Sequence, residues 1–71
     1  MAPFRVRCEW WKHGDVDADG PSTTCETEGD IEGWLVSPEI TKLRQRADGS
    51  YVPMFFAEDL GTGRTWQIIP P

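Results

Sequence analysis

The sequence predicts a mainly β fold, with a β-rich α+β fold as the variant, arranged as a small bent antiparallel sheet or open barrel of about five or six short strands. Two observations predict this class. The segment "FRVRCEWW" alternates apolar and polar residues, which is typical of a strand with one buried face. Gly and Pro punctuate short segments that are rich in Thr, Val and aromatic residues, as expected for strands joined by turns.

The chain is small but rich in aromatic side chains. It has 71 residues, among them four Trp, three Phe and one Tyr. This length predicts a single domain over residues 1–71, and each aromatic side chain can bury roughly 150–250 Å² in its core. No segment resembles a signal peptide or a membrane span. We therefore expect a cytoplasmic protein that makes no membrane contact.

The first half of the chain predicts a β-hairpin. A strand over residues 3–11 would pair with a strand over residues 22–28, in a register that places Cys8 opposite Cys25, where oxidation could link them. The same register aligns two opposite-charge pairs, Arg7 with Glu26 and Arg5 with Glu28. The tip of this hairpin would be an acidic loop from about Lys12 to Pro21.

The middle of the chain is ambiguous. "IEGWLV" predicts a short third strand over residues 32–36. In "SPEITKLRQRADG", Ser37 as N-cap and Pro38 at the first helical position favour a helix near 38–46. The alternative is a strand "KLRQR" that an Asp48-Gly49 turn joins to the next strand. We favour the helix and expect at most one.

The last third predicts a second hairpin, with strands over residues 51–58 and 64–69. Placing Glu58 opposite Arg64 also aligns apolar side chains across the two strands. These further pairs are Phe56 with Trp66 and Met54 with Ile68.

Charge is strongly segregated along the chain. The net charge is −5, and eight of the twelve acidic residues lie between His13 and Thr41, where there is no Lys or Arg. This balance disfavours direct binding to nucleic-acid phosphates, which requires clustered basic side chains. It favours a basic protein surface as the partner. The acidic residues expected to bind it are Asp15, Asp17, Asp19, Asp30 and Glu32.

One acidic segment matches a metal-binding pattern. In "GDVDADGPSTTCE", the residues follow D-x-D-x-D-G-x5-E, with Asp15, Asp17, Asp19 and Glu26 at the ligand positions. These twelve residues resemble an EF-hand loop, and the resemblance implies a bound calcium ion. They are also similar to the "D-x-D-x-D-G-x-x-C-E" ending of the excalibur calcium-binding family, with two extra residues before the Cys-Glu pair. Because the flanking segments predict strands, a turn is the first interpretation and a calcium site the alternative.

The inventory of reactive residues disfavours catalysis. There is one His, and there is no G-x-S-x-G motif and no phosphate-binding glycine loop. We therefore predict a non-enzymatic acidic interaction module without a cofactor. It would act as an inhibitor or accessory factor of the kind that phages use, and its targets would include nucleic-acid-binding proteins. The first alternative is a small calcium-binding domain. The second is a single-stranded nucleic-acid-binding barrel that uses Arg5, Arg7 and Trp11 on the outer face of the first strand.

Overall fold

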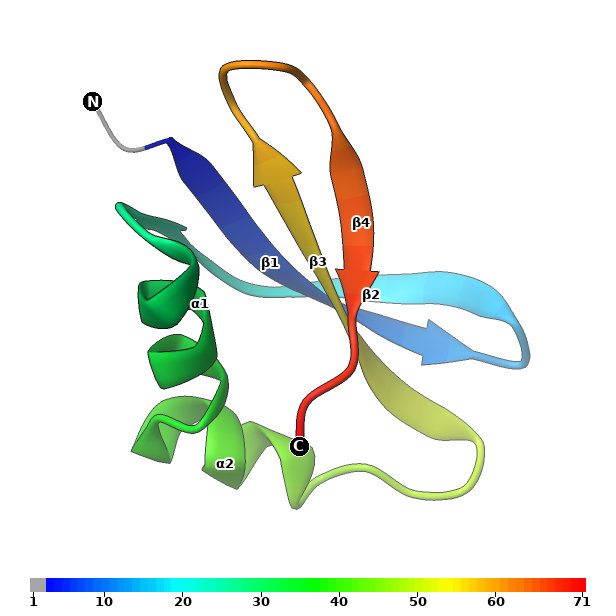
Figure 1. Cartoon of the computed structure of the whole chain (residues 1–71). Coiled ribbons are helices and arrows are strands. Elements are labelled where there is room, and N and C mark those ends of the chain that lie inside the picture. Colours follow the sequence, from blue (N-terminus) through cyan, green and yellow to red (C-terminus); the bar gives the residue numbers. More distant parts are fainter. Residues whose placement is uncertain (1–2) are drawn as a thin grey trace.

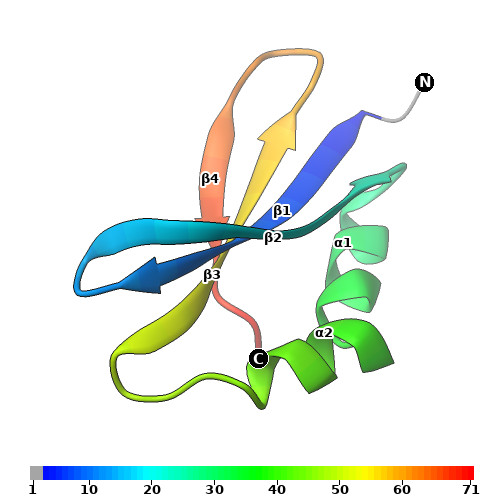
Figure 2. The same ribbon diagram turned by 180° about the vertical axis from the view of Figure 1, so that it is seen from behind.

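The computed structural model describes residues 3–71, which form one four-stranded antiparallel sheet with two helices against one face (Figures 1 and 2). The elements follow in the order β1 (Phe4–Lys12), β2 (Asp15–Cys25), α1 (Glu28–Leu35), α2 (Pro38–Arg44), β3 (Tyr51–Asp59) and β4 (Thr65–Ile68). The strand order is β2-β1-β3-β4, so β2 and β4 are the edges. The predicted mainly β fold is confirmed. However, the sheet has four strands instead of five or six, and there are two helices instead of one.

The alternation in β1 separates the two faces of the sheet as predicted. Val6, Cys8 and Trp10 are buried beneath the helices. The side chains of the alternate residues Arg7, Glu9 and Trp11 contact one another on the open face. The core gathers residues from both layers: Val6, Cys8, Trp10, Cys25, Ile31, Leu35, Ile40, Leu43, Phe55 and Ala57.

A tight turn joins β1 to β2. His13 and Gly14 have φ angles of 51° and 83°, and positive φ at both central residues is typical of two-residue hairpin turns that match the twist of the strands. The turn pairs Lys12 with Asp15. The predicted acidic loop from Lys12 to Pro21 is therefore wrong, because the turn takes only residues 13–14 and residues 15–21 already belong to the returning strand.

The register of this hairpin also differs from the prediction. Cys25 lies opposite Phe4, and Phe4 and Cys8 are about 13 Å apart along β1 at ~3.3 Å per residue. Cys8 and Cys25 are therefore not neighbours, and a disulfide would require the strands to rearrange. The predicted charge pairs are replaced as well, since Arg5 lies opposite Thr24 and Arg7 opposite Ser22. The early turn sets this register.

The predicted strand over residues 32–36 is wrong, because this segment lies at the end of helix α1. The helix begins with a capping box at Thr27. The Thr27 Oγ1 accepts a hydrogen bond from the Asp30 amide at 3.1 Å, and the Asp30 carboxylate accepts one from the Thr27 amide at 3.2 Å. Ile31 and Leu35, one turn apart, are buried against the sheet. Capping and burial together stabilise a helix of low intrinsic propensity.

The helix predicted near 38–46 is confirmed as α2. Ile40 and Leu43 are its buried residues. Ser37 occupies the N-cap position, but its hydroxyl donates a hydrogen bond to the Trp34 carbonyl at 2.7 Å instead of capping α2. This bond ties the two helices together. No helix in the described part of the chain is long and apolar enough to cross a bilayer.

The second hairpin lies close to its predicted bounds, but its register is shifted by one residue. Phe55 pairs with Ile68, and Ala57 pairs with Trp66. The predicted pairing of Phe56 with Trp66 is wrong, as are the other two predicted pairs, Glu58 with Arg64 and Met54 with Ile68. A one-residue shift moves side chains to the other face, so Trp66 and Ile68 lie on the helix side of the sheet.

Candidate functional site

Three aspartates lie on an edge of the sheet, in the half of β2 nearest the turn. Asp15, Asp17 and Asp19 are all exposed, and β2 has a neighbouring strand on one side only. The β1–β2 hairpin extends away from the helices in both ribbon views (Figures 1 and 2). We call these three residues the acidic edge. Its carboxylates are accessible to a partner.

No basic side chain pairs with the acidic edge. In the part of the chain that the structure describes, the only ion pair within 4.0 Å joins Arg7 to Glu9. Asp15 lies opposite Lys12 in the ladder but does not form an ion pair with it, and Asp19 lies opposite Glu9, a second carboxylate. Like charges in facing positions destabilise a sheet. The acidic edge therefore carries unbalanced negative charge.

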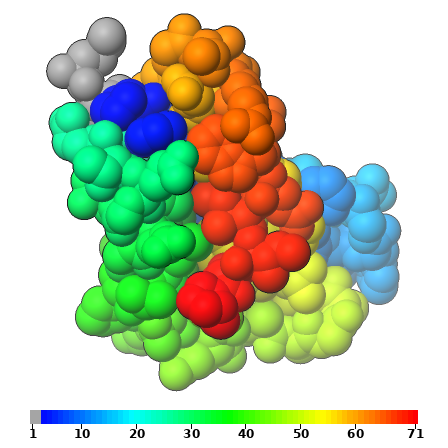
Figure 3. All heavy atoms as spheres, viewed as in Figure 1, coloured from blue at the N-terminus to red at the C-terminus, as the bar shows by residue number. Residues whose placement is uncertain are grey.

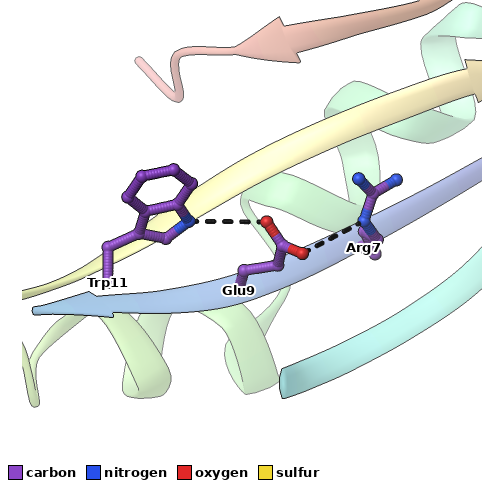
Figure 4. Close-up of polar contacts among 3 residues, drawn as sticks. All are labelled: Arg7, Glu9 and Trp11. Carbon is purple, nitrogen blue, oxygen red and sulfur yellow. Dashed lines mark hydrogen bonds and ion pairs between the residues drawn. The ribbon is translucent and has the colours of Figure 1, made fainter. Parts of the chain in front are cut away.

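A polar chain of contacts occupies the neighbouring open face (Figure 4). The Glu9 carboxylate accepts a hydrogen bond from Trp11 Nε1 at 3.4 Å and lies 3.7 Å from Arg7 Nε. The Arg7 guanidinium also lies 5.0 Å from the centre of the Phe56 ring. Arg7 and Trp11, two of the three residues that the nucleic-acid alternative uses, are thus on the outer face as predicted, and Arg5, the third, is exposed. Arg7 and Trp11 are already engaged by a carboxylate, which lowers their value for binding phosphates.

The five predicted partner-binding residues do not form one patch. Asp15, Asp17 and Asp19 lie on β2, whereas Asp30 and Glu32 lie on α1, on the opposite side of the molecule from the hairpin tip (Figure 1). Asp30 also has a structural role, because its carboxylate completes the capping box of α1. Glu32 is exposed. The acidic edge and the α1 carboxylates must therefore be considered separately.

The residues of the calcium pattern lie along a strand and the segment that follows it. Asp15, Asp17 and Asp19 belong to β2, and Glu26 comes just after its end. A calcium ion needs oxygen ligands at 2.3–2.6 Å from one point, whereas alternate residues of a strand are separated by ~6.6 Å. Over residues 3–71, no group of three or more His, Cys, Asp or Glu side chains is placed to hold a metal ion. The conformation thus differs from that of an EF-hand loop.

Both cysteines are buried free thiols. Burial, with a smaller contribution from the Glu9 carboxylate, raises the pKa of Cys8 to about 11. Burial, followed by the charge of Asp30, also raises the pKa of Cys25. A thiolate is the nucleophilic form of cysteine. These thiols therefore stay protonated near neutral pH and are poor nucleophiles.

A groove, which the sequence analysis did not predict, runs between α1 and β4. It has a volume of about 640 Å³. Its lining residues are Gly29, Glu32, Gly33, Leu35, Val36, Ile68, Ile69 and Pro71. The one available signal in the sequence is the spacing of Gly29 and Gly33, which places both on one side of a helix.

No known protein family, curated protein or solved structure matches this chain. Three properties of the molecule therefore bear on its function. They are the unbalanced charge of the acidic edge, the protonated state of the two buried thiols and the groove between α1 and β4.

Proposed function

We propose that this protein is a non-enzymatic interaction module whose acidic edge binds a basic surface of a partner protein. In this function it acts as an inhibitor or an accessory factor. One observation carries the proposal: Asp15, Asp17 and Asp19 are all exposed, and none has a Lys or Arg partner within the described residues. A basic partner would supply the missing counter-charges.

The arrangement favours fast, salt-dependent association. Carboxylates of one sign on a projecting hairpin attract a positively charged surface before contact and orient it. Interactions between exposed charges are screened over a Debye length of ~10 Å at 0.1 M salt. The acidic edge is therefore expected to act mainly on the association rate.

Charged residues on an edge strand also have a purely protective role. Asp side chains, a proline and bulges keep edge strands from pairing with other chains, and β2 contains Pro21 and two register shifts. Protection and partner binding make different predictions. A protective edge influences aggregation, whereas a binding edge influences the rate of association with one partner.

The non-enzymatic part of the proposal is supported by the state of the reactive side chains. Cys8 and Cys25 are buried, and burial raises the pKa of each from the ordinary value of a thiol. His13 is exposed in the hairpin turn. A cysteine nucleophile needs a neighbouring base or a lowered pKa, whereas burial shifts the pKa of both thiols in the opposite direction.

The test compares two variants that remove the same amount of charge. A partner is first identified by cross-linking in extracts of the native host, and its association rate is then measured at several salt concentrations. The variant Asp15→Asn/Asp17→Asn should associate about tenfold more slowly at low salt and show a weaker salt dependence. The control Glu26→Gln/Glu39→Gln, exposed residues outside the acidic edge, should keep most of the rate.

An equal loss in both variants would show that net charge alone matters. An unchanged rate in the acidic-edge variant, together with increased aggregation, would assign these residues a protective role and contradict the proposal.

A further inference from the structure

The groove between α1 and β4 lies where the helices leave part of β4 uncovered. Trp66 and Ile68 of β4 face the helix side but remain only partly buried. A second hollow of about 250 Å³ continues the groove, since it shares Glu32 and Ile68 with the first. In Figure 3, α1 (green) lies beside β4 and the C-terminal segment (orange to red), which form the two walls.

Apolar side chains at this groove are unusually exposed. Val36 at the end of α1 is 57% exposed, and Ile69 just after β4 is 84% exposed. Both line the groove together with Ile68. Removing apolar surface from water is favourable. A segment that fills the groove would therefore gain binding free energy from contacts that the chain itself does not make.

Two glycines keep the helix wall of the groove low. A Cβ added at Gly33 would meet nothing within 4 Å, and one at Gly29 would meet only Thr27 Oγ1 at 3.7 Å. Neither glycine has a positive φ. A glycine inside a helix is less favourable than an alanine. No contact among the described residues requires glycine at either position, and the open space beside α1 is available to a bound segment.

Acidic side chains border the same groove. Glu28 and Glu32 lie one turn apart on α1 and line the smaller hollow. Arg64 also lines it, but its guanidinium lies over the Trp66 ring, 5.2 Å from the ring centre. Neither glutamate forms an ion pair within 4.0 Å among the described residues. The groove therefore has an apolar lining, and its border carries two carboxylates against the one guanidinium of Arg64.

We infer that this groove binds an amphipathic segment of the basic partner. The apolar side chains of this segment contact Ile68 and Ile69, and its Lys or Arg side chains lie beside Glu28 and Glu32. This inference rests on the proposed function, because it takes the partner to be basic. The groove is, however, a different surface from the acidic edge. The groove supplies apolar anchoring, which slows dissociation, and the acidic edge speeds association.

The test uses an amphipathic helical peptide of about 18 residues made of Leu and Lys, titrated into ¹⁵N-labelled protein. The amide signals of Gly29, Gly33 and Ile69 should shift on titration. A peptide with the same Leu positions and Glu in place of Lys should bind at least about tenfold more weakly.

A filled groove provides the decisive variant. Gly33→Leu places a side chain in the open space of the groove and should raise the Kd of the Leu/Lys peptide about tenfold or more. The matched control is Gly49→Leu, because a Cβ at Gly49 also meets nothing within 4 Å and Gly49 does not line the groove. This control should leave the Kd unchanged.

The outcomes separate the two proposals. Shifts confined to the acidic edge, with no effect of Gly33→Leu, would overturn the groove inference and leave the proposed function standing. Groove shifts that persist in Asp15→Asn/Asp17→Asn would support the groove even if partner association proved insensitive to the acidic edge. Groove shifts that appear on concentrating the protein without peptide would overturn the inference in favour of a second copy of this chain.

Discussion

Gly20 of β2 lies directly against Cys8 of β1. A Cβ built on Gly20 would stand 3.0 Å from both Cβ and Sγ of Cys8, and 3.1 Å from its carbonyl oxygen. The contact occurs at a register shift, where the ladder passes from the Arg7–Ser22 pair to the Glu9–Asp19 pair. The bulge thus brings the backbone of an edge strand onto a fully buried side chain. A Cβ at this position would contact Cys8 so closely that Cys8 would have to move by a few tenths of an ångström.

Replacing Gly20 by Ala should therefore destabilise the protein. The added methyl would overlap Cys8, and overpacking of this kind costs about 1–3 kcal/mol. The free energy of unfolding in urea measures the effect. Gly33→Ala is the matched control: its Cβ meets nothing within 4 Å, so it should stabilise the helix by up to about 1 kcal/mol. Equal effects of the two substitutions would contradict the close contact at Gly20.

The buried Cys8 thiol should make stability fall at alkaline pH. Its pKa is about 11 in the folded protein, against 9.0 for an ordinary thiol. Between these values the unfolded chain loses the proton and the folded chain keeps it, so the free energy of unfolding decreases as pH rises. In the Cys8→Ala variant, the free energy of unfolding measured in urea should decrease less steeply over this pH range. The part of the decrease that is due to Cys25 should remain. An unchanged slope would show that Cys8 is not shielded from solvent.

Asp48 should contribute stability that is lost in acid. Its carboxylate accepts hydrogen bonds from the Ser50 amide at 2.8 Å, the Tyr51 amide at 2.9 Å and the Ser50 hydroxyl at 3.1 Å. These bonds, with a smaller contribution from Lys12, lower the pKa of Asp48. The stabilisation is present above the unfolded pKa and disappears as pH falls through the lower folded pKa.

The measurement is the melting temperature as a function of pH below about 4. Asp48→Asn keeps a hydrogen-bond acceptor but cannot titrate, so its melting temperature should depend less on pH than that of the unmodified protein. Parallel pH curves for the two proteins would rule out this role for the carboxylate.

The capping box should be a main support of α1. Thr27→Ala removes the hydroxyl that accepts the Asp30 amide hydrogen bond, and loss of an N-cap side chain costs about 1 kcal/mol, with a range of roughly 0.5–2 kcal/mol. Thr27→Ser retains the hydroxyl, so its free energy of unfolding should decrease much less. Urea unfolding of both variants gives the comparison. A serine variant as unstable as the alanine variant would show that the methyl group, and not the cap, matters.

The sequence by itself determined those features that depend on residues within one element. The alternation in β1 indicated which side chains are buried, and Val6, Cys8 and Trp10 are buried as the period of a strand requires. Helix α2 was indicated by Pro38 at its first position and by Ile40 and Leu43, which lie on one face of a helix. The segregation of acidic residues was also visible, because charge needs no knowledge of the fold.

Tertiary structure decided the features that join distant segments. Helix α1 contains two glycines, which disfavour a helix locally, and it forms because Ile31 and Leu35 are buried against the sheet. The register of β2 depends on the turn at His13 and on two bulges that only a paired strand can define.

The two candidate surfaces arise in the same way. The acidic edge became an edge because the strand order leaves β2 with one neighbour. The groove requires α1 and β4, which lie far apart in the sequence, to pack with a gap between them. Sequence pattern and composition describe each element alone. The burial of apolar side chains and the pairing of strands act between elements, and they determine where the two surfaces lie.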